Sequence, residues 1–521
     1  MKAGLHLELD ARKLPENADE VLTAQIAAGL GISERDLLSY RIIRRSLDAR
    51  KKPHVKLLYQ IVADIRDGVV PARMEEPPEE PVPLRIPDNR ANVHHPLVIG
   101  SGPAGLFAAL LLAKAGAQPV VIERGRDVER RKQDIDSFFA TRKLNGESNL
   151  LFGEGGAGTW SDGKLYTRIR DPRGGYVLQE FVQAGAQPEI LYYAHPHIGS
   201  DRLPGVIAAI RRQIIALGGK FLWDTQVTGI EGEEKFCAVR LSNGERIEAP
   251  AALIACGHSA RPLIETLCRK LEFSMKGFQI GCRIEHPQRF INRDRFGSEI
   301  PAPPLGAAEY LFSVSGNERG QGATTFCMCP GGVILPATSE EGRLATNGMS
   351  ESARDGRFAN SAIVSTLGPE TFSTPEEAFA FLRKLETDVY ELGGGGYAAP
   401  GQKAEDFLAR RGGKISRESS YAFGVTPSRL DRLVPEPVRS ALMNALRKFD
   451  RQAPGFVREG VLIGMETRVS SPVRFQRNAE TLESSMRNLY VGGEGGGCAG
   501  GIVSAAVDGL RLAEKMLENR N

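Results

Sequence analysis

The chain has 521 residues, 41% of them hydrophobic, which is enough for about two to four domains with sizeable cores. The formal net charge is +3, so the composition does not indicate a polyanionic partner such as nucleic acid. Seven cysteines at irregular spacing form neither a disulfide framework nor paired zinc ligands, and we expect no metal site. There is neither an apolar signal core nor a run of about 18 apolar residues, so we expect a cytoplasmic protein without a membrane partner. A trimmed transit peptide for a plastid or mitochondrion is the alternative.

Residues 1–70 predict a small α/β unit with the order strand, helix, strand, strand. Leu5, Leu7 and Leu9 alternate as in a half-buried strand, and the later segments have one helical and two extended patterns. Residues 71–95, rich in proline and glutamate, predict a linker. The basic residues of the unit have three interpretations: a solvated strand and turn, which we favour, an RNA-binding surface, or a lid on the catalytic face. These residues are Arg41, Arg44, Arg45, Arg50, Lys51 and Lys52.

Residues 96–275 predict the first part of a dinucleotide-binding fold. An apolar strand, the glycine turn Gly100-x-Gly102-x-x-Gly105, an apolar helix and a second apolar strand that ends on Glu123 follow one another. Gly100 permits the tight turn, Gly102 lets a pyrophosphate approach the backbone, and Gly105 lets the helix pack closely on the strand. The helix N-terminus offers free N–H groups to the phosphates. Glu123, 18 residues after Gly105, is placed to accept hydrogen bonds from ribose hydroxyls.

Residues 455–521 predict the return of the chain to this fold. A short strand runs into Gly493-Glu494-Gly495, and more glycines precede a helix. FAD enzymes of the glutathione-reductase type have a similar late segment. This resemblance implies that the acid contacts the ribityl or pyrophosphate part of FAD and that the helix start faces the flavin ring. A helix N-terminus at that place would stabilise the negative charge of reduced flavin.

Two more glycine segments are predicted at the same site. The first, residues 153–164, would bring backbone N–H groups close to the flavin, and an ordinary surface loop is the alternative. The second, residues 252–257, is predicted to be a strand and turn that rejoins the sheet. No second G-x-G-x-x-G is present, so we expect any NAD(P)H to visit only transiently. The predicted FAD contacts are Gly100, Gly102, Pro103, Ala104, Gly105, Glu123, Arg124, Gly155, Gly156, Gly158, Ser161, Lys164, Val227, Cys256, Gly257, Gly493, Glu494, Gly500, Gly501 and Ile502.

Residues 276–454 have strands and helices of their own and are predicted to form an inserted substrate or cap domain. The expected fold class is therefore α/β: a Rossmann-type FAD-binding domain with an inserted α+β substrate/cap domain and a small N-terminal α/β (β-α-β-β) domain.

Several further segments resemble a family of largely uncharacterised FAD-dependent dehydrogenases, often called NAD(FAD)-utilising dehydrogenase-like. The resemblance covers nearly the whole chain and implies FAD and redox chemistry without an agreed substrate. It is carried by residues 45–50, 152–165, 194–199, 326–332, 347–350 and 466–472.

Two pairs in these segments are candidate catalytic residues. His195 and His197 share a face of an extended segment and could act as proton donors beside the flavin or as a structural pair. Cys327 and Cys329 also share a face. They could relay electrons through a disulfide, or be two small buried apolar side chains, and C-x-C closure is strained.

A third candidate is Arg468, which shares a face with Glu466. It could bind a substrate carboxylate or phosphate, or form a structural ion pair. Lys164 could favour reduced flavin by its charge or be a solvated lysine.

The sequence thus predicts an FAD-dependent oxidoreductase with one non-covalent FAD and hydride transfer between an unidentified small-molecule substrate and flavin N5. The alternatives are a flavin-dependent nucleic-acid-modifying enzyme, a non-catalytic FAD-binding sensor or scaffold, and saturation of a polyprenyl lipid, which no long apolar stripe supports. Nothing in the sequence indicates the oligomeric state.

Overall fold

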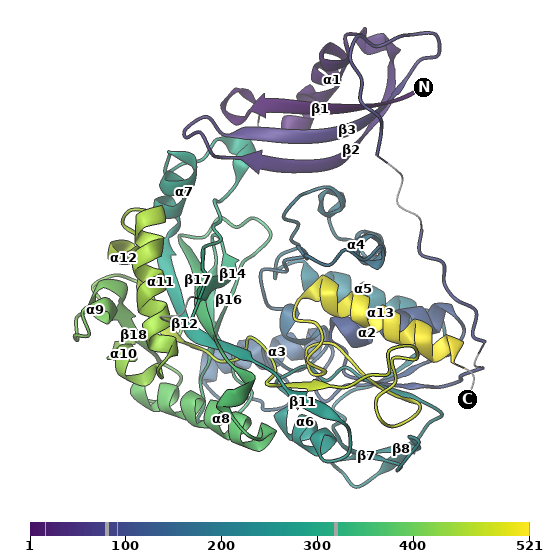
Figure 1. Ribbon diagram of the computed structural model, residues 1–521, viewed down its shortest axis with the longest axis vertical. Helices are drawn as coiled ribbons and strands as arrows, with labels where there is room; N and C mark the ends of the chain where they lie inside the picture. The colour runs from purple at the N-terminus through teal and green to yellow at the C-terminus, as the bar shows by residue number, and fades with distance from the viewer. Residues whose placement is uncertain (16, 79–82, 91, 317–320, 520–521) are drawn as a thin grey trace.

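The chain folds into three parts, each built on a sheet of its own (Figure 1). The structure is a computed structural model, and it describes residues 1–15, 17–78, 83–90, 92–316 and 321–519. Residues 79–82 and 91 of the predicted linker lie outside the described residues.

The N-terminal part is a three-stranded antiparallel sheet with the order β1-β3-β2 and one helix. The predicted order of strand, helix, strand, strand is present. Leu5, Ile26 and Ile61 are buried in its core, because one face of the sheet packs on the helix. The elements are β1 (Lys2–Asp10), α1 (Leu22–Leu30), β2 (Leu37–Asp48) and β3 (Lys56–Ile65).

The second part holds a parallel sheet of five short strands with the order β22-β10-β4-β5-β6. The chain runs from β4 outward to β6 and then returns to the other side of β4. This reversal of strand order, between β4 and β10, is where ligands bind at the carboxyl ends of parallel strands. The strands are β4 (Leu97–Ile99), β5 (Val120–Ile122), β6 (Lys220–Leu222), β10 (Ala252–Ile254) and β22 (Leu489–Val491).

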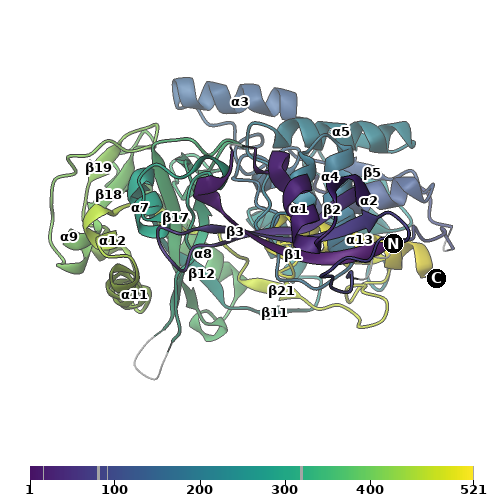
Figure 2. The ribbon, with the colours of Figure 1, turned by 90° about the horizontal axis from the view of Figure 1, so that it is seen from above.

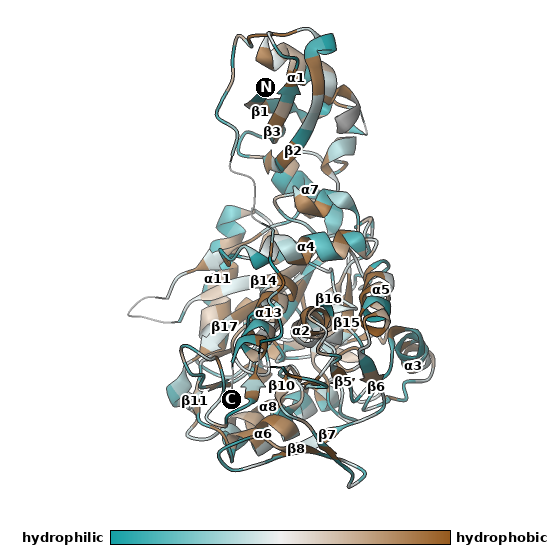
Figure 3. Ribbon diagram, turned by 90° about the vertical axis from the view of Figure 1, so that its right-hand side faces the viewer, coloured by the Kyte–Doolittle hydropathy of each residue, from teal (hydrophilic) through white to brown (hydrophobic). Residues whose placement is uncertain are grey.

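Helices cover this sheet, and α2 and α13 pack side by side on it although they come from opposite ends of the fold (Figure 1). α2 is buried almost all round, whereas α5 presents both apolar and polar residues (Figure 3), as expected for a helix with one solvated face. The helices are α2 (Pro103–Lys114), α3 (Val128–Thr141), α4 (Arg173–Gln183), α5 (Leu203–Ala216), α6 (Arg261–Cys268) and α13 (Ile502–Glu518). A small antiparallel sheet precedes β10 and consists of β7 (Val227–Glu231), β8 (Ala238–Leu241) and β9 (Arg246–Glu248).

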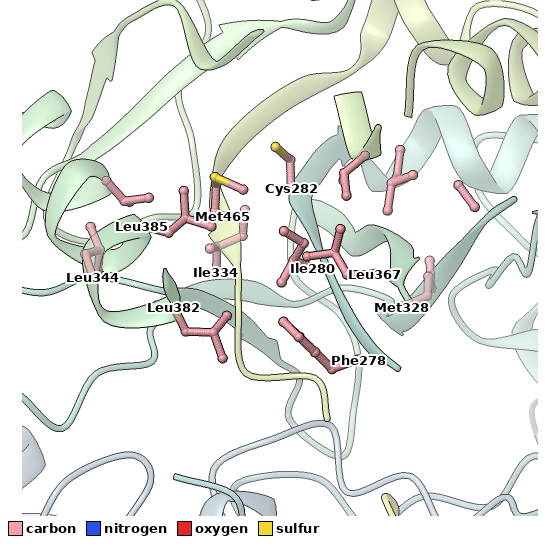
Figure 4. Close-up of a cluster of buried hydrophobic side chains, with 14 of the residues drawn as sticks. Phe278, Ile280, Cys282, Met328, Ile334, Leu344, Leu367, Leu382, Leu385 and Met465 are labelled. Atoms are coloured by element: carbon pink, nitrogen blue, oxygen red, sulfur yellow. The ribbon is translucent and has the colours of Figure 1, made fainter. Parts of the chain in front are cut away.

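The third part is built on a seven-stranded mixed sheet with the order β13-β14-β17-β12-β20-β18-β19. Its central strands bury apolar side chains such as Ile280, Leu367 and Met465 against α8 and its neighbours (Figure 4). The strands are β12 (Phe278–Pro287), β13 (Ser313–Val314), β14 (Ala323–Cys329), β17 (Phe358–Leu367), β18 (Ala399–Lys403), β19 (Val425–Pro427) and β20 (Val461–Glu466). The helices are α7 (Gln288–Phe296), α8 (Pro375–Leu392), α9 (Ala404–Leu408), α10 (Leu430–Leu433), α11 (Val438–Gln452) and α12 (Phe456–Glu459).

One predicted boundary is wrong. The sequence places residues 455–521 in the return to the nucleotide-binding fold, but β20 lies between β12 and β18 in the seven-stranded sheet. The chain crosses back only after β20. Two segments connect the nucleotide-binding part with the seven-stranded part, and they pair as a short antiparallel ribbon. This ribbon consists of β11 (Phe273–Met275) and β21 (Val473–Phe475). A second ribbon, β15 (Val333–Pro336) with β16 (Thr346–Met349), lies beside the seven-stranded sheet.

Seen from above, the N-terminal sheet lies across the junction of the other two parts (Figure 2). Its contacts agree with this view. β2 bonds to the segment that follows α4, and Lys52 forms an ion pair of 3.7 Å with Asp294 on α7.

Candidate functional site

The predicted glycine turn has the close approaches that only glycine allows. A Cβ on Gly105 would lie 1.9 Å from the Gly100 carbonyl oxygen, and one on Gly100 would lie 2.4 Å from the Ala255 oxygen. Gly100 also has a φ of +100°, which favours glycine. The turn, which connects β4 to α2, therefore packs closely on the residue that follows β10, at the place where the strand order reverses.

The other predicted glycine segments lie against this turn, so the structure brings them together as a glycine cradle, defined as Gly100–Gly105, Gly153–Gly158 and Gly493–Gly501. Gly155 N–H donates to the Ser101 oxygen at 2.9 Å, and a Cβ on Gly156 would lie 3.1 Å from Gly102 Cα.

The late segment completes the cradle. A Cβ on Gly493 would lie 3.1 Å from Ala104 Cβ, and one on Gly495 would lie 3.1 Å from Cys256 Sγ. A Cβ on Gly158 would lie 3.2 Å from Ile502 at the start of α13.

The cradle has the features that a dinucleotide needs. A Cβ on Gly102 would meet only Gly156 Cα, at 3.9 Å, so the space in front of the turn is open. α2 and α13 both begin at glycines, Gly102 and Gly501, that have no side chain of their own to cap the first N–H groups; at α13 the Gly501 N–H itself donates to Ser504 Oγ at 2.9 Å. Uncapped helix N-termini attract phosphates and the negative charge of reduced flavin. The residues present therefore fit FAD.

Glu123 is buried, and its carboxylate holds the cradle together. One oxygen accepts from Ser101 N–H (2.9 Å) and the Ser101 hydroxyl (2.8 Å), and the other accepts from Gly125 N–H (3.0 Å) and Gly153 N–H (3.2 Å). The rotatable Ser101 hydroxyl is the donor that a ribose hydroxyl could replace, so the predicted ribose contact stays a prediction.

Arg124, which follows Glu123, has partners outside the cradle. Its guanidinium group donates to Glu147 at 2.8 and 2.9 Å and lies over the Phe152 ring at 3.8 Å. Val227 is the first residue of β7 and is buried. Thr225, two residues before it, donates its N–H to the backbone carbonyl oxygen of Glu123 at 3.0 Å. Arg124 and Val227 thus lie near Glu123, the residue that follows β5.

Glu494 lies where the late segment meets the crossing after β20. Burial raises the pKa of its carboxyl to about 7, and Ser471 N–H donates to it at 3.2 Å. A Cβ on Gly500 would lie 2.7 Å from its other oxygen, so the carboxyl faces the start of α13. Near this point, His258 follows Gly257, and burial lowers the pKa of its imidazole to about 3.

A group of charged side chains lies between the cradle and the seven-stranded sheet. We call this group the open cluster and define it as Asp162, Lys164, His195, His197, Glu309, Cys327 and Arg354. Arg354 Nε donates to Asp162 at 3.0 Å, and Lys164 Nζ lies 3.4 Å from the same carboxylate. Lys164 Nζ is buried and has no hydrogen-bond partner among the described residues. The predicted lysine therefore faces the sheet rather than solvent.

The two predicted histidines belong to this region but have different partners. His195 hydrogen bonds to Glu309, and this bond raises the pKa of its imidazole. His197 lies opposite Lys164, its Nε2 is 3.1 Å from the Ser352 oxygen, and burial lowers its pKa. At neutral pH the first is suited to hold a proton and the second to be neutral.

Cys327 and Cys329 lie at a bulge of β14, where the register to β17 shifts between Phe326 and Cys329. Cys327 has a φ of +46°, and it is half-buried while Cys329 is fully buried. Arg283 on β12 donates to the Cys327 oxygen at 2.6 Å and approaches Cys329 Sγ at 3.5 Å.

The interpretation of Arg468 as a substrate-binding residue that shares a face with Glu466 is not supported. β20 ends at Glu466, so the alternation of a strand does not continue to Arg468. Glu466 bonds to Arg283 at 2.9 Å, whereas Arg468 is buried and donates to Glu386 at 3.0 Å. The structure has the structural ion pair that was the alternative.

We call the group around Glu386 the closed cluster. The Glu386 carboxylate accepts from Arg261 at 2.7 and 3.0 Å, from Thr467 at 2.7 Å and from Arg468 at 3.0 Å, and Arg468 also donates to Ser339 at 3.3 Å. Every acceptor position of the carboxylate is filled. The cluster joins α6, α8 and the segment after β20.

Sequence reasoning missed Asp162, Arg283, Glu309 and Arg354. Asp162 lies in a glycine-dense segment, and that position is a signal that could have found it. The other three come from distant segments, and no local pattern marks them. The sequence also left open what Arg45 does.

Arg45 connects the N-terminal sheet to the open cluster. Its backbone bonds to Tyr192 and Ala194, at 2.8 and 2.9 Å, directly before His195. Its guanidinium donates to the Tyr193 hydroxyl at 2.7 Å and to the Pro304 oxygen at 3.1 Å, and it lies over the Tyr193 ring. Of the three interpretations of the basic residues, these contacts favour the lid for Arg45.

The described part of the chain has neither a metal-binding group of side chains nor a membrane-spanning helix. No group of three or more histidine, cysteine or acidic side chains there could hold a metal ion. None of its helices is long and apolar enough to span a bilayer.

Comparison with known proteins agrees with the cradle. A family model for an FAD-binding domain matches residues 94–133, and one described as "FAD-dependent protein, C-terminal domain-like" matches residues 277–469. A domain of unknown function matches residues 6–64. An uncharacterised protein of Clostridium beijerinckii is 41% identical over 510 residues, 96% of each chain. The chain belongs to the same family as this clostridial protein. It is a mixed α/β protein with an FAD-binding domain.

Solved structures show only distant likeness. Glycine oxidase from Geobacillus kaustophilus is 11% identical, with a TM-score of 0.34, over 82% of this chain and 94% of that chain. L-proline dehydrogenase from P. horikoshii is 10% identical, with a TM-score of 0.35, over 82% and 94%. A geranylgeranyl bacteriochlorophyll reductase-like protein from Thermoplasma acidophilum is 11% identical, with a TM-score of 0.37, over 82% and 78%.

Proposed function

We propose that the protein is an FAD-dependent oxidoreductase that holds one non-covalent FAD and moves hydride between a small-molecule substrate and the flavin. The observation that carries this proposal is the glycine cradle, where the N-termini of two helices that begin at glycines meet three glycine segments at the reversal of the parallel sheet. The resemblance to NAD(FAD)-utilising dehydrogenases supports the same proposal.

Bound FAD would supply hydride transfer at its N5 atom. The protein would position the cofactor and stabilise its negatively charged groups. The first N–H groups of α2 would hold the phosphates, and the start of α13 would stabilise the negative charge of the reduced ring. Glu494, in the late segment, would contact the ribityl chain.

The open cluster is the part of the chain best suited to the substrate. It lies between the cradle and the seven-stranded sheet, and its Lys164 amine has an ion pair but no hydrogen-bond partner in the described residues. His195, whose proton is held by Glu309, would exchange a proton with the substrate at its imidazole.

The test is anaerobic stopped-flow reduction of the FAD-reconstituted full chain by NADH, NADPH and a panel of metabolites. We expect at least one donor to bleach the flavin band and a later acceptor to restore it. His195→Gln should slow proton-coupled turnover and shift its pH profile, while Arg44→Met, an exposed change, should not. If no donor reduces the flavin, the oxidoreductase proposal fails and the sensor or scaffold alternative stands.

A further inference from the structure

The two thiols of the β14 bulge have an environment unlike that of the other buried cysteines. Cys282, on β12, two strands away in the same sheet, belongs to the apolar core (Figure 4), and burial raises the pKa of its thiol to about 12. Cys327 and Cys329 instead lie beside each other and beside the guanidinium group of Arg283. Cys329 Sγ also lies 3.3 Å from the Cys327 oxygen. The pKa of the Cys327 thiol is lowered and that of the Cys329 thiol is raised, so the pair is poised to exist as one thiolate and one thiol.

Two cations face this pair from different parts of the molecule. Lys164 follows the cradle, and its buried amine has no hydrogen-bond partner in the described chain. It interacts electrostatically with both thiols. Arg283 approaches Cys329 Sγ at 3.5 Å from β12. Together they supply the electropositive surroundings that stabilise a thiolate.

Acidic and further charged groups also face the pair, and they do not cancel the cations. Asp162 lies beside Lys164 but is shared with Arg354. Glu466 is bonded to Arg283 at 2.9 Å, and burial raises the pKa of its carboxyl to about 7, so its charge is incomplete at neutral pH. His197 lies opposite Lys164. With these groups present, the hydrogen bond from Cys329, followed by the charges of Lys164 and Arg283, lowers the pKa of the Cys327 thiol.

We propose that Cys327 is a nucleophilic thiolate, that Cys329 is its resolving partner, and that the substrate of this site is a disulfide. This deepens the proposed function and rests on it for the source of electrons. Cys327 is the attacking residue because it is half-buried, whereas Cys329 is fully buried. The positive φ of Cys327 at the bulge is a strained conformation of the kind that functional sites retain.

The steps balance as follows. The Cys327 thiolate attacks one sulfur of the disulfide, forms a mixed disulfide and releases the first thiolate. The Cys329 thiol loses its proton to that thiolate and attacks Cys327 Sγ, which forms the Cys327–Cys329 disulfide and releases the second thiolate. Two electrons and one proton from the reduced cofactor then restore one thiolate and one thiol. C-x-C closure is strained, so this disulfide is easily reduced.

The first test needs no cofactor. The full chain is alkylated with iodoacetamide at about pH 6 and about pH 8, and each cysteine is followed by mass spectrometry. Because a thiolate reacts and a thiol does not, we expect the rate at Cys327 to change less than about threefold, while the rate at the exposed Cys237 changes at least tenfold. Lys164→Met should make the pH dependence of Cys327 steeper, toward that of Cys237, and Lys164→Arg should preserve the shallow one. If Cys327 is unreactive, or follows Cys237 in the wild type, the proposal is overturned.

The second test uses the reconstituted, reduced full chain with hydroxyethyl disulfide as the probe. We expect thiol release that Cys327→Ser lowers at least 100-fold, and we expect Cys329→Ser to trap the mixed disulfide. Cys282→Ser is the matched control and should retain turnover. Full turnover in Cys327→Ser would overturn the proposal. Loss of FAD binding with unchanged alkylation would instead overturn the proposed function and leave the thiolate intact.

Discussion

The open and closed clusters lie at the same junction between the nucleotide-binding part and the seven-stranded sheet, but they are built differently. In the closed cluster each hydrogen-bond position of the Glu386 carboxylate is filled by Arg261, Thr467 or Arg468. In the open cluster the Lys164 amine has an ion pair but no hydrogen bond in the described residues, and His195 is largely exposed. A carboxylate whose acceptor positions are all filled holds parts together, and an amine without a hydrogen bond is ready to bind something else. The contrast lies in these two groups, because Arg468 Nε in the closed cluster is also buried without a partner in the described residues.

The largest effect is expected in the closed cluster. Glu386→Gln would leave the buried guanidinium groups of Arg261 and Arg468 with only the more distant carboxylate of Glu340, at 4.0 and 3.7 Å. We expect a loss of about 3–5 kcal/mol in the free energy of unfolding, measured by denaturant titration. Asp388→Asn, which removes the half-buried partner of the exposed Lys384 on the same helix, is the control and should cost less than about 1 kcal/mol. Equal losses in the two variants would remove the distinction between the clusters.

A smaller effect is expected where the N-terminal sheet is attached to the open cluster. Arg45→Met removes two guanidinium hydrogen bonds and the contact with the Tyr193 ring. We expect a loss of about 1–2 kcal/mol, with faster hydrogen exchange at residues 192–194. Arg44→Met changes the exposed neighbouring residue and should leave that exchange as it is. Unchanged exchange in Arg45→Met would show that the contact does not hold the segment before His195.

Within the open cluster, Lys164→Met should cost little stability. Asp162 keeps its hydrogen bonds to Arg354, and methionine fills the volume of the lysine stem, so we expect a loss of about 1 kcal/mol. Thermal unfolding of this variant beside Glu386→Gln measures the contrast directly. A loss as large as that of Glu386→Gln would mean that Lys164 is structural.

The smallest effect concerns the proton on His195. The hydrogen bond to Glu309 raises the pKa of the imidazole above its ordinary value of 6.5, so the pair stabilises the fold fully below pH 6.5. This contribution is lost as the pH rises through the raised pKa. In Glu309→Gln we expect the pKa of His195 to fall toward 6.5, as followed by NMR titration. An unchanged titration would show that Glu309 does not hold the proton.

The cradle could be predicted from the sequence because each of its glycines has a local task. Gly100 and Gly105 make close contacts, within the turn and with the residue after the neighbouring strand, that leave no room for a side chain. The spacing of these glycines in the sequence therefore indicates the turn. The late return through Gly493 and Glu494 has a local pattern of the same kind. The FAD-binding domain was therefore recognisable, as the family match over residues 94–133 confirms.

The open cluster could not be predicted as a unit, because its partners are far apart in the chain. Asp162 and Arg354 are separated by 192 residues, and His195 and Glu309 by 114. The errors have physical reasons as well. The apolar pattern of β20 does not reveal which sheet a strand joins, and Arg468 was placed by strand alternation that ends at Glu466.

The central claim is that the glycine cradle holds FAD, and the visible spectrum of the reconstituted chain after desalting tests it most directly. We expect the wild type and the control Gly205→Leu, in an exposed position of α5, to retain the flavin bands. Gly102→Leu should fold, because the space before Gly102 is open, but should lose the bands because its side chain occupies the place of the pyrophosphate. A wild-type chain without flavin, or a Gly102→Leu chain that retains it, would contradict the account.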